Sequence, residues 1–257
     1  FNITSCQFAI HYFFESIETL ASFCRNVSEM TKVDGYFIGT SYDGNLIYEQ
    51  FQDKNEGESI SIRENNKTIW EITKRYSQTE FNDDDTSVGY AIDVYQESIN
   101  KTFREYLVNY EYFTRIMENY GFVKLTTDEI KQINVPASQG NFSQLYERME
   151  QEVGNNRRRR DEYGQALNMT ANERRISFLN RYFIFKKVGN VDAEVTATAL
   201  THNQPVETKE VEEEKEKEDI TVPENIDEVK EEQETTLSDA PKKLTKRKKK
   251  RVLKLKK

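Results

Sequence analysis

All of the aromatic side chains in this chain lie in its first 189 residues, and this asymmetry limits where a folded core can form. The sequence has 15 Phe, 14 Tyr and a single Trp, all before residue 190. Aromatic side chains supply much of the apolar area that a domain buries, whereas a segment rich in Glu and Lys cannot bury enough surface to offset its chain entropy. We therefore expect one folded domain over residues 1–189, a disordered acidic linker over residues 190–241 and a basic tail over residues 242–257.

The charges beyond the expected domain are separated by sign. Residues 207–239 contain 15 acidic and 4 basic side chains, and residues 242–257 contain 11 basic side chains and no acidic one. The basic tail suits a nuclear-import signal, a non-specific contact with RNA or an anionic membrane patch. Pairing with the acidic segment before it is an equal alternative to RNA contact. Because the tail lacks aromatic residues for base stacking, any contact with RNA is expected to be salt-sensitive.

The composition argues against several other classes of protein. No stretch approaches the roughly 18 uninterrupted apolar residues of a membrane span, and no basic leader precedes the first apolar run. We therefore expect an intracellular protein of the nucleus or cytoplasm, with no membrane partner. Two cysteines and two histidines, without a CxxC or HExxH pattern, also lead us to expect no metal.

The first 190 residues alternate between strand-like and helix-like segments, which predicts an α/β fold. Residues 1–10 suggest a buried strand, residues 17–27 repeat apolar side chains at helical spacing, and residues 36–42 form another apolar strand. This order predicts a right-handed parallel crossover. β-like patches at residues 59–63 and 68–76 predict an inserted hairpin. Further helices are expected over residues 46–51, 103–120, 142–153 and 161–167, and further strands over residues 122–125 and 177–186.

A cluster of polar and aromatic residues follows the first expected strand. Its members are Gln7, Phe8, His11 and Tyr12. Open α/β sheets bind their ligands just beyond the carboxyl ends of their strands, so Gln7 can hydrogen-bond a polar ligand there, and His11 and Tyr12 can meet a planar group. The alternative is that the aromatic side chains fill the core and that His11 is a polar residue whose hydrogen bonds are made within the fold.

These residues belong to a longer pattern. Residues 5–16 have the sequence SCQFAIHYFFES and residues 34–44 have the sequence DGYFIGTSYDG, a combination that resembles the mRNA cap guanine-N7 methyltransferases of large DNA viruses. The resemblance covers about residues 1–188 and includes, in the same order, WEITKRY at 70–76, IDVYQESI at 92–99, EYLV at 105–108 and ISFLNRYFIF at 176–185. It implies a Rossmann-like class I methyltransferase sheet, S-adenosylmethionine as methyl donor and the guanine of capped RNA as acceptor.

The resemblance also implies roles for individual positions. Gln7 and Phe8 match residues that line the methionine end of the donor site. His11 and Tyr12 match the pair that faces the cofactor and the cap guanine, so Tyr12 borders both ligands. Glu105 matches the carboxylate that reads the guanine edge, because a carboxylate accepts hydrogen bonds from both N1 and N2 of guanine. Without the resemblance, Glu105 would simply face solvent near the start of a helix.

Some positions depart from the family pattern. An aromatic residue near the C-terminal strand closes the guanine pocket in the family, and either Tyr182 or Asn180 aligns there; we take Tyr182 as the candidate. Asp34 and Tyr42 stand where many members have Gly and Pro.

Guanine N7 is already a lone-pair nucleophile, so the resemblance implies catalysis by positioning, which contributes roughly 7–11 kcal/mol, and no acid or base residue.

One part of the family pattern has no counterpart in this sequence. The glycine-rich loop and the acidic residue that hold the methyl donor precede the first strand in the family, and no segment here resembles them. We therefore expect the C-terminal portion of such an enzyme, which by itself binds S-adenosylmethionine poorly and shows negligible methyl transfer, with further capping domains possible upstream. Two other functions stay open: a methyltransferase acting on a small metabolite, and a non-catalytic RNA-binding or allosteric subunit of a capping complex.

Overall fold

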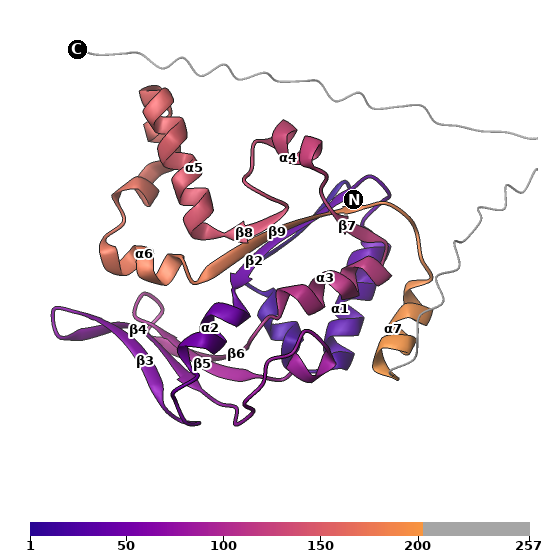
Figure 1. The fold of residues 1–257 in the computed structure, drawn as a ribbon, viewed down its shortest axis with the longest axis horizontal. Helices are drawn as coiled ribbons and strands as arrows, with labels where there is room; N and C mark the ends of the chain where they lie inside the picture. The colour runs from indigo at the N-terminus through magenta and orange to yellow at the C-terminus, as the bar shows by residue number, and fades with distance from the viewer. Residues whose placement is uncertain (203–257) are drawn as a thin grey trace, which may run out of the picture. The chain divides into compact units, whose positions relative to one another are not determined.

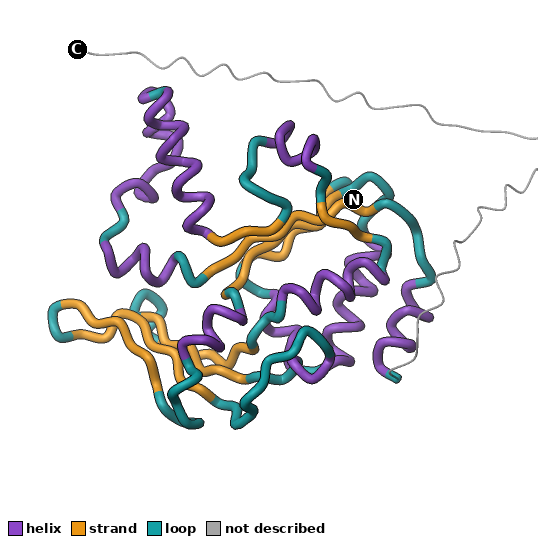
Figure 2. Tube along the Cα trace, in the orientation of Figure 1, coloured by secondary structure: helices purple, strands orange, loops and turns teal. Residues whose placement is uncertain are grey.

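The computed structural model describes residues 1–202, which fold into two β-sheets and the helices around them (Figure 1). Figure 2 shows the sheets as two separate groups of strands. This arrangement confirms the predicted α/β fold class. The predictions made for the acidic segment at residues 207–239 and for the basic tail at residues 242–257 fall outside the described residues.

The first sheet is mixed and has five strands. Its main path runs through β1 (Ile3–Gln7), β2 (Tyr36–Tyr42), β9 (Asn180–Lys187) and β7 (Phe122–Lys124), and the short β8 (Gln139–Asn141) also pairs with β9. β1 and β2 are parallel, and η1 (Ile10–Glu15) and α1 (Ile17–Met30) connect them. The predicted parallel pairing of these two strands is therefore confirmed. The other pairings in this sheet are antiparallel.

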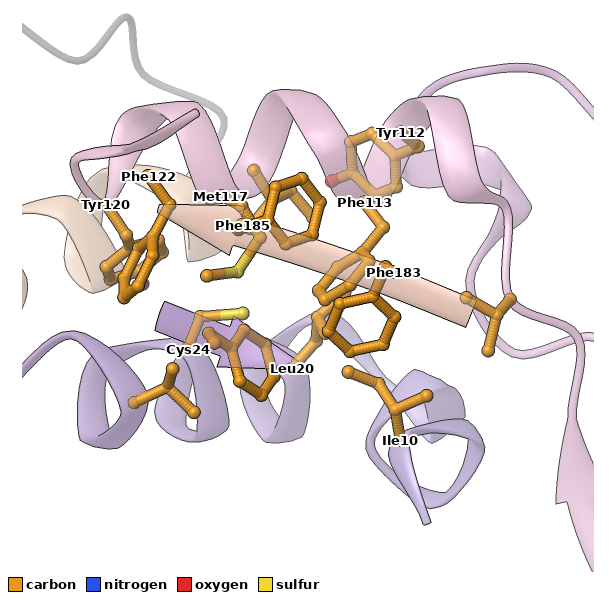
Figure 3. Packing of buried hydrophobic residues seen from close by; sticks show 14 of the residues in the cluster. Ile10, Leu20, Cys24, Tyr112, Phe113, Met117, Tyr120, Phe122, Phe183 and Phe185 are labelled. Carbon is orange, nitrogen blue, oxygen red and sulfur yellow. The ribbon is translucent and has the colours of Figure 1, made fainter. Parts of the chain in front are cut away.

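Aromatic side chains fill the core on one face of the first sheet. Phe183 and Phe185, two residues apart on β9, lie between α1 and α3 (Tyr110–Asn119) (Figure 3). Phe37 of β2 belongs to the same buried cluster. The rings of Phe37 and Phe183 meet edge to face with their centroids 5.0 Å apart, an arrangement that aromatic quadrupoles favour. The helix α1 adds a buried apolar stripe that includes Leu20, because one face of an amphipathic helix turns to the core.

The second sheet is an antiparallel meander of four strands. These are β3 (Ser59–Glu64), β4 (Lys67–Lys74), β5 (Ala91–Gln96) and β6 (Lys101–Tyr106). The turn between β3 and β4 consists of Asn65 and Asn66, which both have the positive φ of a tight hairpin turn. The predicted hairpin is confirmed: it lies in the chain between strands of the first sheet, and it forms half of a second sheet.

The second sheet has its own apolar core, which it shares with α2 (Gly44–Gln50). Trp70 of β4 is buried there, and its Nε1–H donates a hydrogen bond of 2.9 Å to the hydroxyl of Tyr42 at the end of β2. This bond ties the two sheets together beside the site described below. The remaining helical segments are η2 (Asp85–Ser87), α4 (Thr127–Ile133), α5 (Phe142–Asn155), η3 (Arg157–Asn168), α6 (Ala171–Ser177) and α7 (Ala193–Thr201).

The single helix expected over residues 103–120 is wrong. The first part of this stretch is β6, and α3 begins only at Tyr110. Asn109 caps the start of α3, because its side chain accepts hydrogen bonds from the backbone N–H groups of Glu111 and Tyr112. Asn is a preferred residue at this capping position. The apolar spacing fits a helix locally, but β6 pairs with β5 along its whole length, and this tertiary pairing decides its conformation.

Two further expectations need correction. The strand expected to be buried, β1, has alternating exposed and half-buried side chains, and Ile3 is 59% exposed. The domain boundary at residue 189 is too early, because α7 follows it and packs Ala193 and Ala197 against the core beside α1. Small side chains let α7 approach the core closely while adding little apolar area. The hydrophobic density of the sequence therefore did not indicate this helix.

Candidate functional site

A cavity of about 480 Å³ opens where the end of β1, the second sheet and the start of β9 meet. Its volume lies in the range of small-molecule sites. Three groups of side chains line it: Phe8, His11 and Tyr12 after β1; Val94, Gln96, Ile99, Phe103 and Glu105 from β5, β6 and the turn between them; and Tyr42, Ile176 and Asn180 from β2, α6 and β9.

The chain turns sharply after β1 and so brings the first group to the cavity. Phe8 adopts a left-handed φ of 51°, and its backbone N–H donates to the carbonyl of Thr40 at 2.9 Å. Such a conformation is uncommon for a residue other than glycine and occurs often at functional sites. The following segment, η1, buries Ile10 in the core. Tyr12 lies at the cavity, with its ring edge to face against His11 at a centroid distance of 4.3 Å.

Glu105 reaches the cavity from β6. Side chains alternate between the two faces of a strand, so Phe103 and Glu105 point the same way and both line the cavity. Arg104 lies between them in sequence and points to the other face, where it pairs with Asp93 of β5. The arginine is therefore directed away from the carboxylate of Glu105.

The structure brings His11 and Glu105 together. Nε2 of His11 lies 3.6 Å from Oε2 of Glu105, and both side chains are buried. This separation is too long for a good hydrogen bond. The neighbouring parts of the same elements are held by a bond of 2.9 Å from the hydroxyl of Tyr106 to Oε1 of Glu15. The distance between His11 and Glu105 therefore leaves their polar atoms available to a ligand.

Burial sets the protonation states of this pair. Burial lowers the pKa of His11 to about 4 and raises the pKa of Glu105 to about 7. At neutral pH the imidazole is therefore neutral, and the carboxyl group is divided between its protonated and ionised forms. Within residues 1–202, neither ring nitrogen of His11 nor Oε2 of Glu105 has a hydrogen-bond partner. Because unpaired buried polar atoms destabilise a fold, this pair indicates a site for a polar ligand.

Two of the predicted site residues lie outside the cavity lining. The carboxamide of Gln7 is already engaged, since it accepts from the hydroxyl of Thr40 at 2.9 Å and donates to the hydroxyl of Ser5 at 3.0 Å. The hydroxyl of Tyr182 is held at the backbone of Ala137, which it contacts at 3.0 Å through the carbonyl and 3.1 Å through the N–H. Of the two residues considered for the end of the pocket, Asn180 is the one that lines it.

The cavity lining includes residues that were not predicted from the sequence, among them Tyr42, Gln96 and Phe103. Phe103 could have been found from Glu105, because residues two apart on a strand share a face, but this required knowing that the segment is a strand. Gln96 comes to the cavity only through the pairing of β5 with β6. Tyr42 had been noted only as a departure from the family pattern, and it lies in the wall.

The loop after Tyr42 is shaped by close packing. Asp43 accepts the backbone N–H of Asn45 and so caps α2, while its other carboxylate oxygen lies 3.1 Å from Nη1 of Arg181. A Cβ atom on Gly44 would lie 2.3 Å from the carbonyl oxygen of Val108. Glycine is thus required where this loop meets the segment that follows β6.

The described residues contain neither a group of metal-ligating side chains nor a helix that could cross a membrane. Over residues 1–202, no three His, Cys, Asp or Glu side chains are grouped so that they could hold a metal ion. The helices in the same range are all too short or too polar to cross a membrane.

The fold and the cavity define an α/β protein in which a buried His–Glu pair lines the cavity. The chain belongs to the mRNA (guanine-N(7))-methyltransferase domain family, because the model of that family matches residues 1–188. The family inferred from the sequence resemblance is confirmed by this match.

Individual relatives match over part of their length. The chain is 27% identical over 209 residues to a protein of Acanthamoeba polyphaga mimivirus named "Probable mRNA-capping enzyme", covering 75% of this chain and 18% of that protein. It is 35% identical over 82 residues to mRNA cap guanine-N(7) methyltransferase 1 of Arabidopsis thaliana, covering 32% of this chain and 21% of the relative. The chain thus spans about a fifth of the length of these curated relatives.

Solved structures give a weaker likeness. An S-adenosylmethionine-dependent methyltransferase from Clostridium acetobutylicum aligns with a TM-score of 0.36 and 10% identity, over 74% of this chain and 59% of that one. The CcbJ methyltransferase from Streptomyces caelestis aligns with a TM-score of 0.39 and 7% identity, over 74% and 58%. Both TM-scores lie below 0.5, so the assignment rests on the family model.

Proposed function

We propose that this chain forms the guanine site of an S-adenosylmethionine-dependent methyltransferase that modifies N7 of the mRNA cap. The observation that carries the proposal is the buried pair of His11 and Glu105, whose facing polar atoms have no partner within the described residues. Membership in the cap methyltransferase family supports the same substrate. The mimivirus relative is named as a probable mRNA-capping enzyme, which is consistent with further capping activities on the same polypeptide.

Glu105 is proposed to read the Watson–Crick edge of guanine. Its ionised carboxylate can accept hydrogen bonds from N1–H and from the N2 amino group at once, and such charge-assisted pairs are among the stronger hydrogen bonds. Adenine has neither donor in this arrangement and would leave the carboxylate buried and unpaired. A site built to pair a hydrogen-bonding group discriminates strongly against an analogue that lacks it.

His11 and Tyr12 are proposed to position the guanine ring. The imidazole of His11 is neutral at working pH because burial lowers its pKa to about 4, so it places no positive charge beside the purine. Guanine N7 attacks through its own lone pair, so no residue has to remove a proton. The contribution of the protein is therefore orientation, which is worth roughly 7–11 kcal/mol when reacting atoms are held in line.

The methyl donor would be held at the open side of the same cavity. Phe8 and Tyr12 line the cavity and are partly exposed to solvent, and the flat apolar faces of their rings suit the methionine end of S-adenosylmethionine. Gln7 would contribute through the turn that its bond to Thr40 fixes. When bound, S-adenosylmethionine supplies an electrophilic methyl group on a sulfonium centre.

The proposal is tested by the base specificity of binding, which does not require the donor. The full 257-residue chain is titrated calorimetrically with GTP, ITP and ATP, which share the same phosphates but present two, one and no matching donors at N1 and the 2-position. We expect affinity in the order GTP, ITP, ATP, and we expect Glu105→Gln to remove most of the preference. The matched control is Glu118→Gln, because Glu118 is exposed on α3.

Methyl transfer supplies the second measurement. With labelled S-adenosylmethionine and GpppA-capped RNA, a polypeptide extended upstream to include the donor-binding segment should place the label at guanine N7, whereas this chain by itself should transfer little label. In the extended polypeptide, Glu105→Gln should reduce the rate by at least tenfold. Equal affinity for the three nucleotides would overturn the guanine assignment. A small-molecule methyltransferase would instead bind none of them, and a non-catalytic subunit would bind capped RNA without transferring the label when the donor is bound.

A further inference from the structure

The outer rim of the cavity has a different character from its buried end. Four large apolar side chains that line the cavity are also exposed to solvent: Phe8 (53%), Tyr12 (43%), Ile99 (53%) and Phe103 (41%). Phe8 and Tyr12 belong to the segment assigned above to the donor and the guanine. Ile99 and Phe103 belong to the β5–β6 hairpin, and the proposed function gives them no role.

Phe103 and Ile99 are not explained by the packing of the fold. Within residues 1–202, neither side chain belongs to either of the two apolar cores or to the residues packed against them. Phe103 lies opposite Val94 in the strand register, and Val94 also lines the cavity. The ring of Phe103 therefore stands on the cavity side of the sheet with one part open to solvent.

The position of Phe103 relative to Glu105 is fixed by the strand. The two residues point to the same face of β6, and two residues along a strand advance roughly 7 Å. Phe103 is the one nearer the hairpin turn and the exposed rim. A ligand whose first base pairs with Glu105 therefore finds an aromatic surface at the mouth, at a distance that a flexible triphosphate bridge can span.

We propose that Phe103, with Ile99 beside it, stacks on the base of the first transcribed nucleotide of the capped RNA. This inference rests on the proposed function and extends it to a second subsite. Single-stranded RNA is commonly held by bases stacked on exposed aromatic side chains. Because every base has a flat aromatic face, the platform accepts any nucleotide, and purines stack more strongly than pyrimidines.

The test compares ligands with and without the second base. The full chain is titrated at pH 8 with GTP, GpppA and GpppC, and the ratio of the GTP to the GpppA dissociation constant is determined for each variant. GTP and GpppA differ in phosphate charge, but this difference affects the ratio in the same way in every variant. It therefore cancels when the ratio of a variant is compared with that of the unmodified chain. We expect Phe103→Ala to lower the ratio by about 5- to 100-fold and to leave the affinity for GTP unchanged.

Two more variants distinguish stacking from loss of fold or of apolar contact. Phe103→Trp keeps an aromatic face and should retain the ratio, whereas Phe103→Leu should lower it almost as far as Phe103→Ala. A Phe103→Ala protein that binds GTP normally is folded, so its ratio can be interpreted. The second subsite is disproved if Phe103→Ala leaves the ratio unchanged or if it weakens GTP and GpppA equally.

Failure of the guanine site has a different signature. In that case the unmodified chain shows no preference for GTP over ATP, and Glu105→Gln changes nothing, which overturns both proposals. Retained GTP preference with an unchanged Phe103→Ala ratio overturns the second subsite alone.

Discussion

Nε2 of His11 lies 3.6 Å from Oε2 of Glu105, although one residue follows the first strand of the first sheet and the other lies in the last strand of the second. Both groups are buried, and the basic residue nearest in sequence, Arg104, turns to the opposite face of β6. A carboxyl group in such surroundings holds its proton more tightly, which makes its ionisation sensitive to what binds beside it.

The affinity for a guanine cap should depend on pH through Glu105. Only the ionised carboxylate can accept from both N1–H and the N2 amino group, and burial raises the pKa of Glu105 to about 7. Affinity for GpppA should therefore fall by about tenfold between pH 8 and pH 6, as measured by calorimetry. GpppA is used because it has no terminal phosphate to titrate. Glu105→Gln should bind weakly with a flat profile; the same slope in this variant would refute the role of Glu105.

The stability of the protein should contain two opposing contributions from the same pair. Glu105 has an ordinary pKa of 4.5 and a folded pKa of about 7, so its contribution is complete below pH 4.5 and is lost as pH rises through 7. His11 has an ordinary pKa of 6.5 and a folded pKa of about 4, so its contribution is complete above pH 6.5 and is lost as pH falls through 4. The two slopes oppose each other between about pH 4.5 and 6.5.

Glu105→Gln should uncover the histidine slope. The free energy of unfolding of this variant, measured with urea at pH 4.5, 5.5 and 6.5, should rise with pH more steeply than that of the unmodified chain. His11→Gln should show the reverse, with stability falling as pH rises. Glu118→Gln serves as the control and should follow the unmodified chain. Parallel curves for all four proteins would show that burial does not shift these two groups.

Gly44 should be intolerant of any side chain. A Cβ atom there would meet the carbonyl oxygen of Val108 at 2.3 Å, and backbone cannot move aside as a flexible side chain can. We expect Gly44→Ala to lower the free energy of unfolding by about 2 kcal/mol or more. Gly154 of α5 is the matched control, because a Cβ atom there has no neighbour within 4 Å in the described structure, and Gly154→Ala should be neutral or slightly stabilising. A larger loss at Gly154 would contradict this packing argument.

Tyr182 should matter for stability and not for guanine binding. Its hydroxyl bonds both backbone groups of Ala137, so Tyr182→Phe should lower the free energy of unfolding by about 1–2 kcal/mol while the affinity for GTP is unchanged. Asn180→Ala, which alters the cavity wall, should weaken GTP binding. If Tyr182→Phe were the variant that lost affinity, Tyr182 would be the residue that closes the pocket.

The sequence by itself determined the order of the early elements and pointed to three candidate side chains that line the cavity. Its local patterns predicted the parallel β1–β2 unit and the β3–β4 hairpin, and its motif pointed to His11, Tyr12 and Glu105. These features depend on residues close together in the chain, through apolar spacing, turn chemistry and a compact motif.

Only the tertiary structure decided how these side chains are combined. The segment around Glu105 has a spacing that fits a helix, and its pairing with β5 makes it a strand, which places Phe103 on the cavity side. Asn180 and Tyr182 lie two residues apart on β9, and β8 pairs with β9 at Tyr182. The hydroxyl of Tyr182 is held by the backbone of Ala137, just before β8, so Asn180 lines the cavity and Tyr182 does not. Pairing partners and packing neighbours come from distant parts of the chain, and no local pattern records them.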